Sequence, residues 1–223
     1  VVALALKHNV PYTFQRPTDN DAWKVYFTHF PDIKINDEER TYYNEDVYEY
    51  KEIPYNGGTL CLCGYFQSEK YFVEHREEIL KAFNFKWEPI KDKVSIHVRR
   101  TDYVVGSPFE PITMEYISLA INYFRSMGFH NFVVFSDDQI WCKENITSGV
   151  FDGATFEYSE GRDEFADITY MSECEHNIIA NSTFSWWGAW LNQNPDKIVV
   201  CPRLDKWFNG ANKDLLPEKW IKI

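Results

Sequence analysis

The sequence predicts an α/β protein in which helices cover both faces of a parallel β-sheet. From about residue 91 onward, short apolar stretches typical of strands alternate with segments whose apolar residues have helical spacing. The helical segments also carry start and stop signals, such as the capping residues Thr113 and Asp163 and the terminating Gly128. Strands that alternate with helices form βαβ units with parallel strands. Ligands of such sheets bind beyond the carboxyl ends of the strands, so the residues that follow each strand are the candidates for a site.

The chain divides into two parts of different regularity, which we expect to be two domains, 1–90 and 91–223. In the first part we expect a helix at the start, a strand, and a second helix with Phe72 and Ile79 on its apolar stripe. These elements cover residues 1–9, 60–66 and 68–83. The acidic, tyrosine-rich run between residues 37 and 52 is interpreted as a solvated surface segment.

The second part supplies the regular alternation. We expect strands at 94–98, 131–136, 154–158, 177–180 and 197–201. Helices are expected from Thr113 to Gly128, at 139–144, after Asp163, and at 183–191.

Composition narrows the classes of ligand. The formal net charge is -11, which disfavours binding to nucleic acid or to an anionic membrane. An anionic substrate would therefore need a local cluster of Arg or Lys. The chain is also rich in aromatic residues, with 8 Trp, 14 Tyr and 17 Phe, which fits either sugar binding or an aromatic core.

Cysteine usage and hydropathy bear on metals and location. The five cysteines form no regular framework and are interpreted as reduced thiols. Cys61 and Cys63 would share a strand face, but no second Cys or His pair completes a zinc site, so we predict no metal. No apolar run has membrane-spanning length and no signal peptide is visible. We expect a cytoplasmic protein, with peripheral membrane association as an alternative; the oligomeric state is left open. The chain begins with Val1 within a helical pattern, so we expect further residues before it.

Two adjacent arginines follow the first strand of the second part. His97 and Arg99 share one face of that strand, and Arg100 lies at the turn. Neighbouring guanidinium groups repel each other unless an anion or a carboxylate lies between them, and Arg binds phosphate oxygens in a bidentate fork. The position favours a diphosphate site over the alternative, a structural pair between Arg100 and Asp102.

Polar residues also follow two other strands. Asp137 and Asp138 could hold a metal or a ribose, or could cap the next helix. The stretch 181–188, Asn-Ser-Thr-Phe-Ser-Trp-Trp-Gly, places three hydroxyls at a helix start, where free N–H groups favour an anion. Together with the arginines, this helix start could hold a diphosphate from two sides.

Several strings of the sequence resemble glycosyltransferase family 11, the α-1,2-fucosyltransferases. The similar segments occur in the family's order and span nearly the whole chain: 3–9, 97–104, 135–138, 181–191 and 214–221. The resemblance implies a GT-B type fold, with two Rossmann-like halves facing a cleft, the acceptor on the N-terminal half and GDP-fucose held by the C-terminal half. It implies metal-independent, inverting transfer of L-fucose to the 2-hydroxyl of a terminal galactose in a glycan, with no cofactor.

The resemblance also implies roles for individual residues. Arg99 would contact the diphosphate with support from Arg100. Apart from the resemblance, the acceptor hydroxyl needs a base, for which Asp102 and Glu110 are the nearest candidates. By analogy with the related α-1,6- and O-fucosyltransferases, His97 and Asp167 would contact the nucleoside. The residues implied to line the phosphate site are Ser182, Thr183, Phe184 and Ser185. From its position after a strand, Asp137 is also expected in the donor site.

The chain departs from the family pattern at its start, where a strand and a Gly-Gly-Leu-Gly-Asn-Gln turn are expected. We therefore expect an incomplete N-terminal half. Two other classes remain open: a nucleotide-sugar-binding protein without catalysis, and a carbohydrate-binding module that uses Trp186, Trp187 and Trp190 as a sugar platform. Within the enzyme class, transfer to a different hydroxyl or sugar is the alternative.

Overall fold

The computed structural model describes residues 1–13, 40–46, 49–83, 87–105, 109–207 and 213–223. The chain forms two compact units, one of residues 1–85 with 212–217 and one of 86–211 with 218–223. The boundary lies a few residues before the expected one because Trp87 already belongs to the second unit, where its indole N–H donates to the carbonyl of Ser172 (2.8 Å). Near the end of the chain, Asp214 accepts hydrogen bonds from the Nζ of Lys70 (2.5 Å) and the backbone N–H of Tyr50 (3.1 Å) in the first unit.

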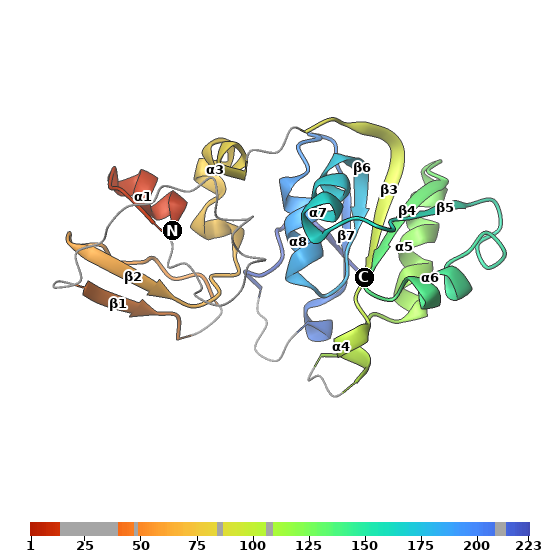
Figure 1. The fold of residues 1–223 in the computed structure, drawn as a ribbon, viewed down its shortest axis with the longest axis horizontal. Helices are drawn as coiled ribbons and strands as arrows, with labels where there is room; N and C mark the ends of the chain where they lie inside the picture. The colour runs from red at the N-terminus through yellow and green to blue at the C-terminus, as the bar shows by residue number, and fades with distance from the viewer. Residues whose placement is uncertain (14–39, 47–48, 84–86, 106–108, 208–212) are drawn as a thin grey trace. The chain divides into compact units, whose positions relative to one another are not determined.

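The second unit is built on a six-stranded sheet in which every neighbouring pair is parallel (Figure 1). The strands are β3 (Ile90–Val98), β4 (Asn131–Ser136), β5 (Thr155–Tyr158), β6 (Cys174–Ile178), β7 (Val199–Cys201) and β8 (Ile221–Lys222). Their order across the sheet is β5-β4-β3-β6-β7-β8. Counted within this unit, that is the doubly wound order 3-2-1-4-5-6, whose strand order reverses between β3 and β6.

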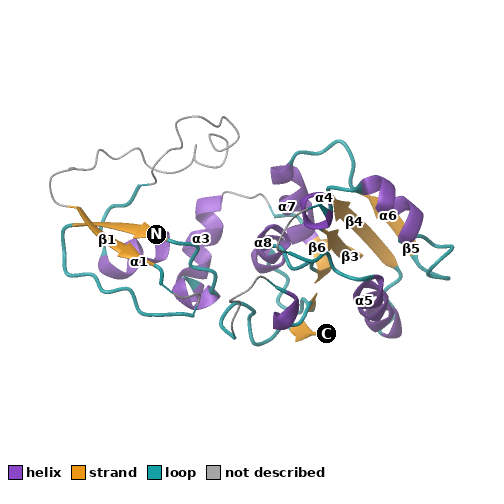
Figure 2. Ribbon diagram, turned by 90° about the horizontal axis from the view of Figure 1, so that it is seen from below, coloured by secondary structure: helices purple, strands orange, loops and turns teal. Residues whose placement is uncertain are grey.

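Helices cover both faces of this sheet (Figure 2). They are α4 (Thr101–Val104), α5 (Met114–Ser126), α6 (Gln139–Asn145), α7 (Glu164–Glu173) and α8 (Thr183–Leu191), with a short 3₁₀ helix, η4, at Leu204–Lys206. One core cluster joins β3, β4 and β6 to α5 and α6, with Ile121 and Phe124 fully buried. A second cluster joins the opposite face of β4, through Val133 and Phe135, to α7 and α8. The predicted α/β class with a parallel, doubly covered sheet is confirmed.

The helix signals act as predicted. The side chain of Thr113 accepts from the N–H of Tyr116 (3.2 Å), and that of Asp163 accepts from the N–H of Ala166 (2.7 Å). Gly128 follows α5 with φ of 95°, a conformation that favours glycine. The bounds of β4 and α8 match the predicted ranges.

The strand β6 is displaced from its expected position. It begins at Cys174, directly after α7, and ends at Ile178, whereas residues 177–180 were expected. Its middle residues, His176 and Asn177, are polar yet buried against the neighbouring strand β3. Buried polar residues conceal a strand from a hydropathy pattern, which explains the error.

The first unit, by itself, contains a two-stranded parallel sheet and several short helices. The elements are α1 (Val2–His8), β1 (Arg40–Asn44), β2 (Thr59–Cys63), the 3₁₀ helices η2 (Glu69–Tyr71) and η3 (Val73–His75), and α3 (Arg76–Phe83). The described residues of the segment interpreted as solvated are mostly exposed, as predicted, and part of that segment forms β1, whose exposed side chains give no apolar alternation. One expectation fails here. The helix expected from Ser68 is interrupted because Phe72 leaves the helical region, with φ of -150°.

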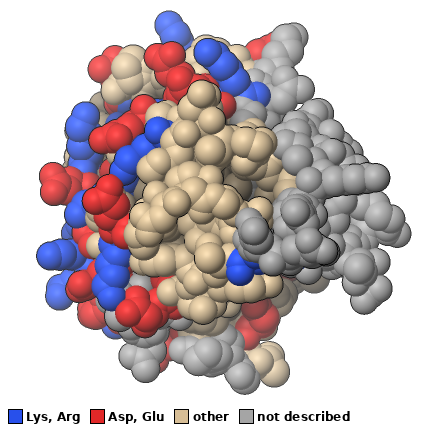
Figure 3. Space-filling model, turned by 90° about the vertical axis from the view of Figure 1, so that its left-hand side faces the viewer, with Lys and Arg blue, Asp and Glu red and all other residues tan. Residues whose placement is uncertain are grey.

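The surface carries both signs of charge (Figure 3), and the cysteines form no disulfide among the described residues. On the face drawn in Figure 3, basic and acidic side chains are interspersed along one side, and uncharged residues occupy the centre. All five cysteines are free, as predicted. Among the described residues, every helix is too short or too polar to span a bilayer.

Candidate functional site

The candidate residues meet where the strand order reverses. The pair Ile96–Ile178 joins β3 to β6, and the pair Val98–Ser136 joins β3 to β4. Because these strands are parallel neighbours, the residues that follow them emerge at one edge of the sheet. The arginines after β3, the aspartates after β4 and the start of α8 after β6 are therefore gathered at this carboxyl edge.

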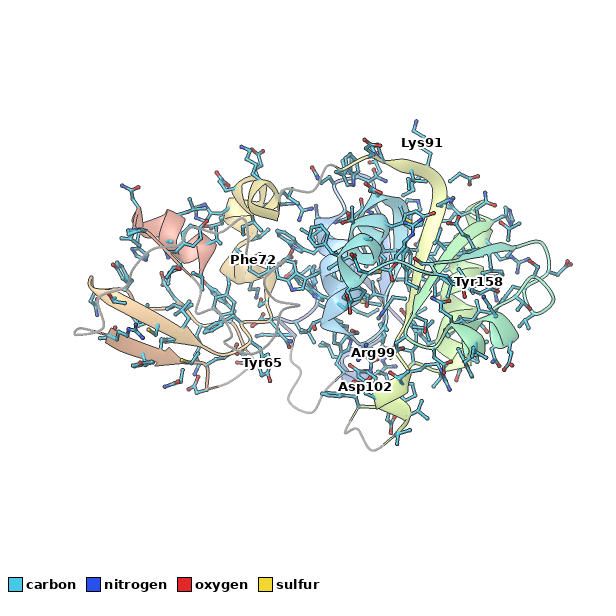
Figure 4. All side chains as sticks on the ribbon, viewed as in Figure 1. Tyr65, Phe72, Lys91, Arg99, Asp102 and Tyr158 are labelled. Atoms are coloured by element: carbon cyan, nitrogen blue, oxygen red, sulfur yellow. The ribbon has the colours of Figure 1, made fainter. Side chains whose placement is uncertain are left out.

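Arg99 lies between two carboxylates. Its Nε donates to Oδ1 of Asp102 (2.8 Å) and lies 3.4 Å from Oδ2 of Asp137. Figure 4 shows Arg99 and Asp102 close together at the start of α4. The side chain is 37% exposed, and in the described part of the chain its two terminal NH₂ groups make no hydrogen bond. Arg99 is thus oriented through Nε, with the forked end of the guanidinium available to a ligand.

Arg100 is held more tightly and does not pair with Asp102. Its Nε donates to Oδ2 of Asp138 (3.2 Å), and its guanidinium carbon lies 3.9 Å from the ring centre of Trp141. A guanidinium stacked on an indole and bonded to a carboxylate is well fixed. The alternative pair between Arg100 and Asp102 is therefore wrong, since Asp102 bonds Arg99 and Asp138 bonds Arg100.

Both aspartates after β4 organise neighbouring backbone. Oδ1 of Asp138 accepts from the N–H of Trp141 (3.1 Å), which caps α6. Asp137 accepts from the N–H groups of Arg100 (2.9 Å) and Thr101 (3.1 Å) and from the hydroxyl of Thr101. Burial alone would raise the pKa of Asp137, but these hydrogen bonds and the charge of Arg99 together lower it. Asp137 thus fixes the start of α4 and Arg99, and its expected contact with a substrate stays a prediction.

His97 is buried one residue before the end of β3. Its ring centre lies 5.4 Å from that of Phe184, and its Nδ1 has no hydrogen-bond partner among the described residues. Burial lowers the pKa of His97 to about 4, so the imidazole is neutral at pH 7. The structure brings His97 and Phe184 together and leaves a buried polar atom that a ligand could satisfy.

The hydroxyl residues at the start of α8 differ in whether their side chains are engaged in hydrogen bonds within the helix start. Ser182 is the N-cap with extended backbone and makes no side-chain cap bond, and Thr183 beside it is exposed. Ser185 is fully buried, and its hydroxyl donates to the carbonyls of Ala180 (3.4 Å) and Ser182 (3.2 Å). The hydroxyl of Ser185 thus stabilises the helix start from within, and its predicted place in the donor site stays a prediction.

Sequence reasoning missed Asn181, which joins three loops at this edge. Its side-chain amide donates to the carbonyls of Glu110 (2.9 Å) and Lys206 (2.6 Å), and its backbone carbonyl accepts from the hydroxyl of Tyr103 (3.2 Å). The loops after β3, β6 and β7 are thereby tied together, and the backbone of Glu110 is held beside the start of α8. The signal in the sequence was an asparagine that follows an apolar stretch and directly precedes the hydroxyl residues Ser182 and Thr183.

Asp167 lies farther along the same edge, beyond β4 and β5. Its carboxylate accepts from the hydroxyl of Ser159 (2.5 Å), and Gln139 bridges the carbonyls of Ser159 (2.8 Å) and Ser136 (3.2 Å). Burial raises the pKa of Asp167, opposed by the hydrogen bond from Ser159. Among the described residues no contact joins Asp167 to Arg99, so the structure leaves its predicted nucleoside role untested.

Two of the three tryptophans of α8 belong to the core, and Trp187 is half-buried. Trp186 and Trp190 are 5% and 2% exposed, and Trp186 packs against Trp220 with ring centres 5.5 Å apart. Within the same helix, Gly188 lies so close to Met171 that an added Cβ would be 3.0 Å from the Met171 Cβ. The alternative of a tryptophan platform for sugar is therefore wrong. Among the described residues, no group of three or more His, Cys, Asp or Glu is placed to hold a metal ion.

Comparison with known proteins assigns the chain to a family. The family model described as Glycosyl transferase family 11 matches residues 3–223. The O-antigen biosynthesis glycosyltransferase WbnK of Escherichia coli is 36% identical over 189 residues, which are 73% of this chain and 60% of that protein. An alpha-1,2-colitosyltransferase of Escherichia coli is 34% identical over 186 residues, covering 74% of this chain and 63% of that protein.

More distant relatives include the galactoside 2-alpha-L-fucosyltransferase SEC1 of Bos taurus, 32% identical over 170 residues, which are 64% of this chain and 44% of that protein. Among solved structures, POFUT1 in complex with GDP-fucose matches with 13% identity and a TM-score of 0.42, over 66% of this chain and 55% of that one. The chain spans about 60% of the length of the two Escherichia coli relatives.

Proposed function

Because the chain belongs to glycosyltransferase family 11, we propose that it transfers L-fucose from GDP-L-fucose to the 2-hydroxyl of a terminal galactose, with inversion at the anomeric carbon. One observation carries the proposal. At the point where the strand order reverses, Arg99 is oriented by two carboxylates through Nε, and the start of α8 follows the adjacent strand. A guanidinium fork and a helix N-terminus at one edge suit a diphosphate.

The donor would lie along this edge with its diphosphate against Arg99 and Thr183. Asp102 and Asp137 would repel a diphosphate on their own, but both are engaged in hydrogen bonds that hold Arg99 and α4. The nucleoside would extend toward His97 and Asp167, where the unpaired Nδ1 and a half-buried carboxylate can accept N–H groups of guanine.

The chemistry is a direct displacement. The acceptor hydroxyl oxygen forms a bond to the anomeric carbon of fucose while the bond from that carbon to the β-phosphate oxygen breaks. The bonding electrons leave with GDP, and Arg99 stabilises the charge that develops there. The hydroxyl proton passes to a carboxylate, for which Asp102 and Glu110 are the candidates. Glu110 is exposed and placed by Asn181, whereas Asp102 is already bonded to Arg99.

The relatives support two donors. One is named as a galactoside fucosyltransferase and another as an alpha-1,2-colitosyltransferase. A screen with GDP-fucose, GDP-colitose, GDP-mannose and UDP-galactose, followed by linkage analysis of the product, separates fucosyl transfer from colitosyl transfer. GDP binding without transfer to any galactoside would favour a binding protein without catalysis.

The test of the site is Arg99→Ala, assayed with GDP-fucose and lactose. We expect the turnover to fall by about a hundredfold or more, because the charge on departing GDP loses its main stabilising group. The matched control is Lys91→Ala, an exposed cation at the opposite end of the same strand (Figure 4), which should leave turnover unchanged. Turnover of Arg99→Ala close to that of Lys91→Ala would refute the assigned role.

A further inference from the structure

One side-chain amide ties together the carboxyl ends of two neighbouring strands of the large sheet. Gln139, the first residue of α6, donates through Nε2 to the carbonyl of Ser136 (3.2 Å) at the end of β4 and to that of Ser159 (2.8 Å). Ser159 directly follows Tyr158, which ends β5 and is labelled in Figure 4. The two bonds use both donors of the amide, so its orientation is fixed. Its Oε1 is buried, so Gln139 can act on a ligand only through other residues.

Ser159 transmits this constraint to a carboxylate. Its backbone is held on both sides, because its N–H donates to the carbonyl of Val134 (2.9 Å) and its own carbonyl accepts from Gln139. Ser159 is 6% exposed, and its hydroxyl donates to Oδ1 of Asp167 (2.5 Å) in the first turn of α7. A continuous series of hydrogen bonds therefore runs from Gln139 through Ser159 to the carboxylate of Asp167.

Asp167 keeps one carboxylate oxygen for a ligand. Its Oδ2 makes no hydrogen bond in the described part of the chain, and the residue is only half-buried, unlike the enclosed Oε1 of Gln139. Burial raises the pKa of Asp167, and the hydroxyl of Ser159 and the charge of Arg162 oppose that rise. An ionised carboxylate only accepts hydrogen bonds, so the ligand group that fits here carries N–H or O–H donors.

We propose that Gln139 is a positioning residue that sets the preference of the donor site for guanine, because it holds Ser159 and, through Ser159, the carboxylate of Asp167. The inference rests on the proposed function, in which Asp167 contacts the base of a GDP-sugar. Guanine presents two adjacent donors, N1–H and the N2 amine, whereas hypoxanthine lacks the amine and adenine presents an acceptor at N1. A carboxylate held in one orientation loses less side-chain entropy when it accepts both donors than one that rotates freely.

The principal test compares GDP, inosine diphosphate (IDP) and ADP by calorimetric titration. We expect the unchanged protein to bind GDP about tenfold more tightly than IDP, and ADP more weakly still, because each analogue loses hydrogen bonds to a charged group. Gln139→Met keeps the length of the side chain and removes both N–H donors. The ratio of the Kd for ADP to the Kd for GDP should fall about threefold or more in this variant.

A matched control separates positioning from a general loss of structure. Asn145 lies on the same helix, and its amide donates to the carbonyl of Trp141 within α6 (2.8 Å). Asn145→Ala should leave the ratio of the two Kd values unchanged, whatever its unfolding midpoint. A merely structural loss weakens the binding of GDP and ADP by the same factor, so the ratio reports the orientation of Asp167 alone.

A second pair of variants isolates the hydroxyl of Ser159. Ser159→Thr and Ser159→Val introduce side chains of nearly equal size into the same buried position, so the cost of extra volume is shared, and only Thr keeps a hydroxyl. Ser159→Thr should retain the preference for GDP over ADP. Ser159→Val should reduce it as much as Gln139→Met does.

The outcomes separate this inference from the proposed function. A ratio that falls in Gln139→Met and Ser159→Val supports the inference even if no fucose is transferred, in which case only the proposed reaction fails. Equal binding of the three nucleotides by the unchanged protein would overturn the inference. So would an unchanged ratio in Gln139→Met or in Ser159→Val, even where transfer of fucose proceeds normally.

Discussion

Two histidines occupy neighbouring strands of the large sheet, toward its opposite edges. His176 lies toward the amino edge on β6, and its Nδ1 accepts from the N–H of Ile198 (3.1 Å). His97 lies toward the carboxyl edge on β3, and its buried Nδ1 has no partner among the described residues. Burial lowers the pKa of both, so both favour the neutral form, but only one has its ring nitrogen satisfied by the fold.

The buried amides show the same contrast. Within the sheet, Asn177 donates to Ser95 (2.7 Å) and to the carbonyl of Met171 (2.7 Å), and its oxygen accepts from Asn192 (2.9 Å). At the carboxyl edge, the side-chain oxygens of Asn181 and Gln139 are buried without a partner in the described part of the chain.

Unsatisfied buried polar atoms are rare in folded proteins, and they call for a specific explanation. Among the described residues, those of His97, Asn181 and Gln139 lie at the carboxyl edge, where a doubly wound sheet binds ligands, as a preformed donor site would require; Nε of Arg125, in the last turn of α5, is also without a partner. The side-chain amides of Asn177 and Asn192 are paired within the fold. A substitution at the carboxyl edge should therefore change both stability and substrate binding, whereas an equivalent substitution of Asn192 should change stability alone.

The largest expected effect comes from His97. Its folded pKa of about 4 lies below the ordinary value of 6.5, so the unfolded chain binds the proton first as the pH falls. Stability should therefore decrease from about pH 6.5 down to pH 4, by about 3 kcal/mol in total. In His97→Phe this loss should be absent, which urea unfolding at pH 7.5, 5.5 and 4.5 would measure as a difference between the two proteins.

His97→Gln is a second variant whose side chain cannot titrate, and it is polar where Phe is apolar. Its stability should depend on pH in the same way as that of His97→Phe. Carboxylates that titrate over the same range remain in all three proteins and cancel in the comparison. An unchanged pH dependence in both variants would show that His97 is not held neutral by burial.

Much of the fold could be predicted from the sequence. The apolar run Asn131–Ser136 and the caps Thr113 and Asp163 located their elements because each signal is local. The edge that gathers Arg99 and Thr183 followed from the parallel arrangement alone. Such features depend on residues a few positions apart, where spacing and side-chain type suffice.

The remainder depended on contacts between distant residues. No local pattern shows that Asp102 would bond Arg99 while Asp138 bonds Arg100, because both choices suit the same charges. The burial of Ser185 and the three-loop contacts of Asn181 likewise arise from packing across the sheet. The strand β1 was hidden because its side chains are mostly exposed.

A matched pair of asparagines sharpens the comparison between the edges. Asn181→Ala and Asn192→Ala each remove a buried amide that donates two hydrogen bonds, so each should lower the free energy of unfolding by about 1 to 3 kcal/mol. Only Asn181→Ala should also raise the KM for GDP-fucose, because it releases the loops around the start of α8. Steady-state kinetics at a temperature where both variants remain folded would measure this.

The stability measurement supplies the control for that pair. Equal destabilisation with equal kinetics would mean that Asn181 is structural in the same sense as Asn192, and the distinction between the edges would fail. Asn181→Asp, which keeps the shape but cannot donate to the carbonyls of Glu110 and Lys206, should resemble Asn181→Ala in its KM for GDP-fucose.

The smallest effect is expected from a charged cluster toward the amino edge. Lys93 donates to Glu157 (2.6 Å) and to the hydroxyl of Tyr170 (2.9 Å), and both charged side chains are about a third or more exposed. Pairs with this exposure contribute little, so Lys93→Met should change the free energy of unfolding by less than about 1 kcal/mol. The hydroxyl of Tyr170 also donates to Glu157 (2.9 Å), and this bond does not depend on the amine of Lys93. Because the cluster lies away from the carboxyl edge, kcat and the KM for GDP-fucose should not change, and a clear shift in either would show that the two edges are coupled.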